Sequence, residues 1–341
     1  MTPTYDPGVT PRPNRVRAAR QAAGLSQAAV AQAAGVSRQT IGTIESGRHR
    51  PSVDAALAIA RAIGCSVEDL FGGPPATTLP VFGELLPNGS PILAARVGDT
   101  VAYASAADAL AFTGWPQANA IIDAGSARPL PDADLDGLLI VGCDPALGTL
   151  ATLLPPNGPK HLIAISGSSG RAITAMAAGR AHGALVHGPI GRLPMPPRGA
   201  LCLHLASWRV GLAARDRPTE LTDLARPGVQ VVQRDAGASS QKAFLAAIEK
   251  ESIPTVDGPI ASGHVDAARR VAEGAVAAVT MEPAALQYKL AFRVLEDHTA
   301  DIWIDPRWRE HPGVEALANT INSAAFATRM QLIGGYDFAA V

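Results

Sequence analysis

Residues 24–50 constrain the fold of this chain most, because they carry the signals of two short helices and a turn between them. Ser26 and Ser37 stand where the helices would begin, and a serine hydroxyl there accepts a hydrogen bond from a free backbone amide. Gly35 suits the left-handed residue that closes a helix. The pattern predicts a first helix over 26–34, a tight turn, and a second helix over 37–46.

These two helices would each have an apolar face and a polar face. Apolar residues recur at helical spacing and are expected in a shared core, namely Val30, Ala34, Val36, Ile41 and Ile44. Short polar side chains begin the second helix. In a helix-turn-helix, the second helix enters the major groove and presents its N-terminal side chains to base edges. The stretch therefore predicts a helix-turn-helix that binds double-stranded DNA.

The same pattern extends over a small all-α domain. Residues 14–72 resemble the Xre/Cro type of helix-turn-helix domain over its whole length. The resemblance implies five helices and a DNA operator as partner. It is carried by LSQ at 25–27, GVS at 35–37, Ile41, IESG at 44–47, RPS at 50–52 and SVEDLF at 66–71.

Gln39 and Thr40 are the predicted base readers, since glutamine can bond adenine through two hydrogen bonds and threonine can contact a thymine methyl. Thr40 could equally cap or pack inside its helix. Arg38 would read guanine or hold a phosphate. Phosphate contacts that set the register are expected from Gln27, Arg48 and Arg50. Glu45 is interpreted as structural. The predicted DNA-binding residues are Gln27, Ser37, Arg38, Gln39, Thr40, Arg48 and Arg50.

Charge is spread unevenly along the chain, whose formal net charge is -1. Residues 1–73 carry eight arginines against five acidic residues, and residues 11–50 carry seven arginines against a single acid. This local excess is what phosphate binding requires. The length of 341 residues exceeds the roughly 250 residues that one hydrophobic core usually serves, so two or more compact units are expected.

Three cysteines, Cys65, Cys143 and Cys202, are far apart and form no CxxC pair. They predict reduced thiols and no metal site. The N-terminus lacks the apolar segment of a signal peptide, and no apolar run approaches the roughly 20 residues of a membrane span. We therefore expect a cytoplasmic protein with no membrane partner.

Turn signals and composition divide the chain into four parts. Residues 1–13 contain four prolines, which indicates a flexible arm, and GGPP at 72–75 indicates a linker. Short strands are expected at 81–85, 92–97 and 100–104, in a small β-rich insert or at the opening of the next domain. The predicted parts are the arm over 1–13, the helix-turn-helix domain over 14–73, a linker and small β-rich segment over 74–136, and a ligand-binding domain over 137–341.

From residue 136 onward, apolar strands alternate with helical stretches, which predicts an α/β fold. Separate strands are expected at 200–207, 290–295 and 301–304. Residues 136–341 resemble the periplasmic-binding-protein-like domain, related to molybdate-binding proteins, that follows a helix-turn-helix in many bacterial regulators. That resemblance implies two α/β lobes, crossover strands near 201–213 and 293–304, and a ligand in the cleft between the lobes. It is carried by GCDPAL at 142–147, GSS at 167–169, residues 234–240, 263–268 and 277–285, and GGYD at 334–337.

Two serine-rich turns, at 166–170 and 237–241, each join the end of a strand to the start of a helix. Free amides, the helix dipole and hydroxyl donors make such a turn an anion site. If the strands belong to opposite lobes, both turns would hold one oxyanion; otherwise they are ordinary helix caps, or the ligand is a neutral metabolite. Arg234 and Arg209 stand at strand ends and could pair with an anion, although both are expected at the surface. The predicted ligand-binding residues are Ser166, Ser168, Ser169, Ala238, Ser239, Ser240, Gln241, His264 and Glu282.

Motifs of several enzyme classes are absent from the sequence: HExxH, GxxxxGK[ST], GxGxxG and GxSxG. Their absence argues against an enzyme, which would be recognised by turnover. The two resemblances imply a transcription regulator. It would bind an inverted-repeat operator as a homodimer and sense a small ligand, with a molybdate- or tungstate-type oxyanion as the candidate effector and no other cofactor. The alternative is an intracellular oxyanion- or metabolite-binding protein without a regulatory switch.

Overall fold

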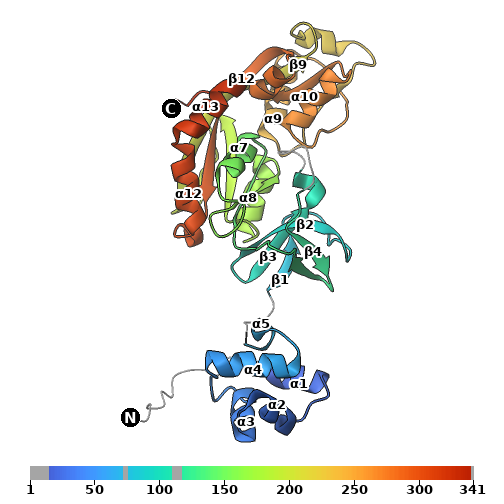
Figure 1. Cartoon of the computed structure of the whole chain (residues 1–341). Helices are drawn as coiled ribbons and strands as arrows, with labels where there is room; N and C mark the ends of the chain where they lie inside the picture. The colour runs from blue at the N-terminus through green and yellow to red at the C-terminus, as the bar shows by residue number, and fades with distance from the viewer. Residues whose placement is uncertain (1–14, 72–75, 110–116, 339–341) are drawn as a thin grey trace. The chain divides into compact units, whose positions relative to one another are not determined.

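The computed structural model describes residues 15–71, 76–109 and 117–338. The chain divides into two compact units, Met1–Ala76 and Thr77–Val341 (Figure 1). The arm predicted over 1–13 and the linker residues 72–75 lie outside the described residues. Within the described residues, no helix is long and apolar enough to cross a membrane.

Unit 1 is helical throughout its described part. Ser26 and Ser37 each accept a hydrogen bond from the backbone amide three residues later, and Gly35 has φ 66°, so these three sequence predictions are confirmed. Val30, Ile41 and Ile44 are fully buried in the predicted shared core. The helices are α1 (Val16–Ala22), α2 (Gln27–Ala34), α3 (Arg38–Glu45), α4 (Val53–Ile63) and α5 (Val67–Phe71).

Unit 2 begins with a five-stranded sheet in the order β1-β3-β2-β4-β5. The strand predicted at 81–85 is wrong, because β1 ends before it and Gly83, at φ 85°, turns the chain away. The strands predicted at 92–97 and 100–104 are confirmed. The strands are β1 (Thr77–Pro80), β2 (Pro91–Val97), β3 (Thr100–Ser105), β4 (Ala120–Asp123) and β5 (Ser126–Pro129).

A mixed seven-stranded sheet in the order β10-β11-β9-β12-β8-β6-β7 organises the rest of unit 2. The parallel pairs are β6 with β7 and β8, and β10 with β11, so the predicted α/β character is confirmed. The strands are β6 (Leu138–Gly142), β7 (Leu162–Ser166), β8 (Gly183–Pro189), β9 (Leu201–Ala214), β10 (Val231–Val232), β11 (Ala277–Met281) and β12 (Ala291–Ile304).

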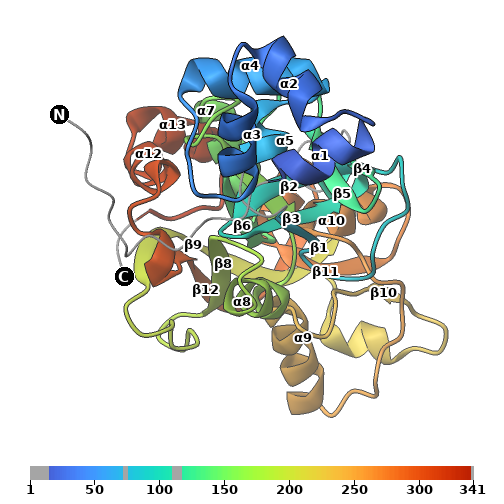
Figure 2. The same ribbon diagram turned by 90° about the horizontal axis from the view of Figure 1, so that it is seen from below.

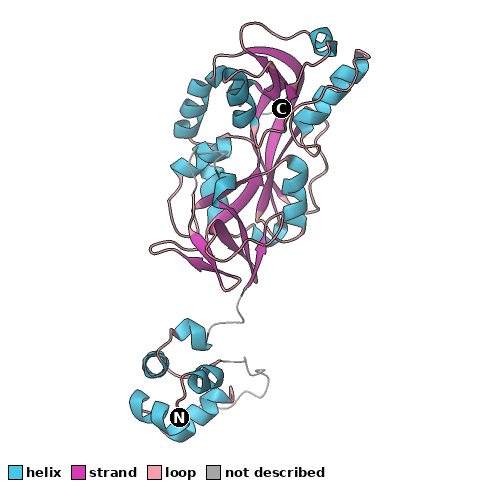
Figure 3. Ribbon diagram, turned by 90° about the vertical axis from the view of Figure 1, so that its right-hand side faces the viewer, coloured by secondary structure: helices cyan, strands magenta, loops and turns pink. Residues whose placement is uncertain are grey.

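Helices flank this sheet (Figure 3). In Figures 1 and 2, α12 and α13 lie on one side of unit 2 and α9 lies on the other. The α-helices are α7 (Ala146–Leu153), α8 (Ser169–Ala177), α9 (Ser239–Lys250), α10 (His264–Ala272), α11 (Glu282–Gln287), α12 (Pro312–Ile321) and α13 (Ala324–Ile333). Short 3-10 turns are η1 (Ala106–Ala109), η2 (Leu221–Ala225) and η3 (Pro306–Trp308).

The two longest strands, β9 and β12, pair antiparallel in the middle of the seven-stranded sheet and contain 14 residues each. They occupy the ranges in which crossovers were expected. The separate strands expected at 290–295 and 301–304 are wrong, because both belong to β12. Its polar middle is still strand, since Asp297 and His298 pair with Arg209 and Trp208 of β9.

Candidate functional site

The start of α3 carries the predicted base readers in unit 1. Arg38 and Gln39 are exposed in its first turn. The Ser37 hydroxyl accepts a hydrogen bond from the Thr40 backbone amide at 3.0 Å and lies 2.8 Å from the Thr40 hydroxyl. Ser37 and Thr40 therefore hold the helix start together, while Arg38 and Gln39 extend into solvent.

Glu45, at the end of α3, is the centre of a polar network and has the structural role predicted for it. Its side chain is fully buried and accepts hydrogen bonds from Arg20 at 2.6 Å and from the Gln27 amide at 2.9 Å, with Arg17 3.4 Å away. Burial opposes ionisation, yet these donors outweigh it and lower the pKa of Glu45. The amide nitrogen of Gln27, a predicted phosphate contact, is thus engaged inside unit 1.

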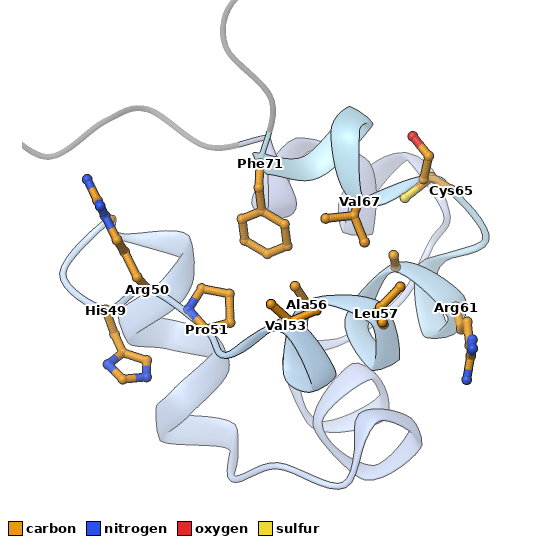
Figure 4. A pocket seen from close by; sticks show the side chains of 13 residues that line it. His49, Arg50, Pro51, Val53, Ala56, Leu57, Arg61, Cys65, Val67 and Phe71 are labelled. Atoms are coloured by element: carbon orange, nitrogen blue, oxygen red, sulfur yellow. The ribbon is translucent and has the colours of Figure 1, made fainter.

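Arg48 and Arg50 follow α3 and are exposed. Arg50 and His49 also border an apolar groove of about 770 Å³ along α4 and α5, which Figure 4 shows from close by. Val53, at 76% exposure, and the half-buried Phe71 form part of its apolar lining. The predicted base readers of α3 do not line this groove, so it is a separate surface of unit 1.

In unit 2, the two serine-rich turns lie next to each other. A Cβ placed on Gly237 would lie 3.2 Å from the Ser168 hydroxyl. The backbone amide of His187 donates to the Ser169 hydroxyl at 3.1 Å, and the Ser239 hydroxyl donates to the His187 carbonyl at 2.7 Å. The turns that begin α8 and α9 therefore meet at one residue of β8.

The predicted ligand residues of these turns divide into two groups. Ser169 and Ser239 bond the backbone of His187. The Gln241 side chain accepts a hydrogen bond from the Arg234 backbone amide at 2.8 Å, which closes the loop between these two residues. Ser166 ends β7 and is half-buried, and Ala238 is the residue before α9. Ser168 and Ser240 are buried, and within the described residues their hydroxyls have no hydrogen-bond partner.

Arg234 stands just before the second of these turns and is buried, so its expected surface position is wrong. Its side chain is 3% exposed, and its Nε and Nη1 atoms have no acceptor among the described residues. Burial lowers the pKa of Arg234. An unpaired buried charge costs several kcal/mol. Arg234 begins the segment 234–240 that carries the resemblance, but its burial depends on segments distant in the chain, which no local pattern encodes.

A histidine cluster adjoins this arginine. His264, predicted as a ligand residue, is 1% exposed, and its Nε2 atom lies 3.7 Å from the Cys143 sulfur. His187 contacts His298 through their Nδ1 atoms at 3.0 Å, and Trp208 packs against the His187 ring at 4.7 Å. Burial, together with the charge of Arg234, lowers the pKa of His264 well below its ordinary value. The sequence predicted Cys143 only as a reduced thiol, and it marked neither His187 nor His298, which stand in no spaced motif.

Glu282, the last predicted ligand residue, lies apart from these unpaired donors. It forms an ion pair with Arg209, whose Nε donates to it at 2.6 Å. Both side chains line a surface pocket of about 320 Å³ that also contacts Trp208 and His298. The carboxylate is therefore neutralised at the pocket, and the pocket adjoins the buried cluster.

Two family descriptions match the chain. Residues 16–70 match the helix-turn-helix family, and residues 156–322 match the PBP superfamily domain. An uncharacterized HTH-type transcriptional regulator of Methanothermobacter thermautotrophicus is 46% identical over 57 residues, which are 16% of this chain and 83% of that protein. A second uncharacterized HTH-type transcriptional regulator, from Bacillus subtilis, is 40% identical over 58 residues, which are 17% of this chain and 88% of that protein. The chain belongs to the helix-turn-helix family of transcriptional regulators.

Solved structures are similar to each part. A phosphate ABC transporter substrate-binding protein of Clostridium perfringens, solved with bound phosphate, is 12% identical with a TM-score of 0.45 and covers 59% of this chain and 98% of its own. The restriction-modification controller protein C.AhdI of Aeromonas hydrophila is 35% identical with a TM-score of 0.16. The match covers 17% of this chain and 86% of that protein. By the two family matches, the chain is a helix-turn-helix regulator with a PBP-like domain after its helix-turn-helix domain.

Proposed function

We propose that this regulator responds to a small oxyanion bound in unit 2. The observation that carries this proposal is Arg234, a buried guanidinium whose Nε and Nη1 atoms have no acceptor in the described part of the chain. The hydroxyls of Ser168 and Ser240 are buried and unpartnered beside the same turns. Donors without acceptors favour a ligand that is all acceptor, and a tetrahedral oxyanion is such a ligand.

The start of α8 adds to this environment. Ser168 is the residue before α8, a helix of nine residues, so the positive end of that helix dipole faces the same turn. Arg234 supplies the charged group that a neutral serine site would lack. Molybdate, tungstate, sulfate and phosphate all present oxygen acceptors of this kind, and the site would select among them by size and charge.

DNA binding belongs to α3 in this proposal. One helix reads too few base pairs for useful specificity, so the regulator would act as a homodimer on an inverted repeat with half-sites about 34 Å apart. A ligand that changes the relation of the two units would change DNA affinity. By linkage, DNA would change ligand affinity by the same factor.

The test is thermal unfolding of the full chain with molybdate, tungstate, sulfate and phosphate in turn. An oxyanion at about 100 times its dissociation constant should stabilise the folded protein by about 2.7 kcal/mol. Arg234→Gln and Ser168→Ala should remove that gain. Arg269→Gln should keep it, because Arg269 is an exposed arginine of α10 already paired with Asp266.

Circular dichroism of each variant without ligand separates loss of binding from loss of folding. Ser168→Ala removes one oxygen at a hydroxyl that bonds nothing among the described residues, so it should fold normally. If no oxyanion raises the melting temperature of the wild-type protein, the oxyanion proposal is wrong. If one does but leaves operator affinity unchanged, the chain binds an oxyanion without a regulatory switch.

A further inference from the structure

Three potential metal ligands meet in the interior of unit 2. Cys143 follows β6, His187 lies on β8, and His264 begins α10. Each offers a sulfur or nitrogen atom, and these atoms all lie within 4.8 Å of one another. The three residues are at most 4% exposed. Within the described residues, His187 Nε2 and His264 Nδ1 have no hydrogen-bond partner.

The spacing of this cluster fits a metal ion. Zinc binds thiolate sulfur at about 2.3 Å and imidazole nitrogen at about 2.0 Å, so a tetrahedral angle places the two ligand atoms about 3.6 Å apart. The Cys143 sulfur and His264 Nε2 lie 3.7 Å apart. That distance is long for a strong hydrogen bond and matches two ligands of one ion.

The protonation of His187 can be worked out from its neighbours. A carboxylate oxygen of Glu296 lies 2.9 Å from His298 Nε2 and can only accept, so His298 carries its proton on Nε2. In neutral His298 the Nδ1 atom is then an acceptor. His187 Nδ1 must then donate to it across 3.0 Å. The lone pair of neutral His187 is therefore on Nε2, its unpartnered buried nitrogen.

A buried imidazole lone pair without a donor suits a cation better than an oxyanion. The chain from His187 through His298 to Glu296 is also the arrangement that orients metal-binding histidines, whose second ring nitrogen donates to a supporting group. Trp208 packs on both His187 and His264, with ring centroids 4.7 Å and 5.7 Å away, and provides an apolar wall.

We propose that Cys143, His187 and His264 bind one thiophilic d¹⁰ metal ion, Zn²⁺ or Cu⁺. Thiolate and imidazole ligands favour these ions over magnesium or calcium. Deprotonation of Cys143 on binding would balance one positive charge of the ion. The three ligands leave one position of a tetrahedron open. This proposal goes beyond the oxyanion effector and does not depend on it.

The test begins with a cobalt(II) titration of the full chain under reducing, anaerobic conditions. Cobalt reports thiolate ligation through a charge-transfer absorption in the near ultraviolet. We expect that absorption at one equivalent of cobalt, its loss on adding Zn²⁺, and its absence in Cys143→Ser. Cys202→Ser is the matched control, because Cys202 is an exposed cysteine of β9 outside the cluster, and it should behave as wild type.

A second variant covers the case in which Cys143→Ser fails to fold. His298→Gln leaves all three ligands in place but breaks the support of His187, and it should weaken zinc binding about 10- to 100-fold. Competition with a chromogenic Cu⁺ chelator then distinguishes a copper site from a zinc site. The proposal is overturned if wild type shows no thiolate-to-cobalt band, or if His298→Gln and wild type bind zinc equally. None of these readouts uses an oxyanion or DNA, so this failure is distinct from that of the proposed function.

Discussion

At the scale of single residues, we propose that sequence-specific DNA binding by α3 depends on the side chain of Gln39. It is exposed in the first turn of α3, whereas its neighbour Thr40 lies against the Ser37 cap. We expect Gln39→Ala to cost about 1–3 kcal/mol at one base position of the operator. The measurement is affinity for the operator and for each single-base variant of it, at fixed salt.

Arg48→Ala is the comparison for that experiment. Arg48 is exposed after α3 and is predicted to contact phosphate. Its loss should therefore weaken binding to all sequences alike and reduce the slope of log affinity against log salt concentration by about one. Equal weakening on every sequence by Gln39→Ala would show that Gln39 is not a base reader.

The sequence predicted residues whose role is local better than residues whose role depends on distant partners. Ser26, Ser37 and Gly35 act within one helical turn, and the structure has them as caps. Arg234 and His187 depend on segments far away in the chain. Their burial follows from the packing of β8, α8, α9 and α10, which no local pattern encodes. For the same reason, the spacing of cysteines predicted no metal site, whereas the fold brings Cys143 to two histidines.

At the scale of elements, the pair β9–β12 depends on Gly211, which lies near the end of β9 and pairs with Val294. A Cβ there would lie 1.9 Å from the Arg293 carbonyl oxygen, a backbone atom that cannot move aside. The register shifts between Val294 and Glu296, so the backbones come close beside a bulge. We expect Gly211→Ala to lower the free energy of unfolding of unit 2 by more than about 2 kcal/mol, measured by urea denaturation.

Gly188→Ala on β8 is the control for this prediction. There the nearest atom to an added Cβ is a methyl carbon of Leu193 at 3.4 Å, which belongs to a flexible side chain. A loss of stability in Gly188→Ala as large as that in Gly211→Ala would contradict the argument from backbone contact.

The sequence predicted β12 as two strands, because its polar residues 296–299 interrupt the apolar pattern. Pairing with β9 along all four residues, and with β8 from His298 onward, extends the strand through them.

At the scale of the whole molecule, the division into a helical and an α/β part was predictable, because the spacing at which apolar residues recur changes between the two parts. Strand order was not, because β9 and β12 lie side by side although about 80 residues separate them in the sequence. The buried polar groups of unit 2 follow from that order. They make its stability depend on pH in a direction that the structure fixes.

His182 is the clearest case. It is 1% exposed, its Nδ1 accepts from the Leu139 amide at 2.9 Å, and burial, aided by the nearby charge of His311, lowers its pKa from 6.5 to about 3. The unfolded chain therefore binds a proton below pH 6.5 that the folded chain does not. Above pH 6.5 His182 does not change the free energy of unfolding. As the pH drops from 6.5 toward 3, His182 lowers the free energy of unfolding by up to about 1.4 kcal/mol per pH unit.

We expect urea denaturation between about pH 7 and pH 5 to show this loss in the wild-type protein. His187 and His264, whose pKa values burial also lowers, add to it with the same sign. In His182→Asn, the amide oxygen can still accept from Leu139 but cannot titrate, so the dependence on pH should be shallower by about one proton. Equal slopes in the two proteins would mean that His182 is already protonated in the folded state, against the burial and the hydrogen bond that keep it neutral.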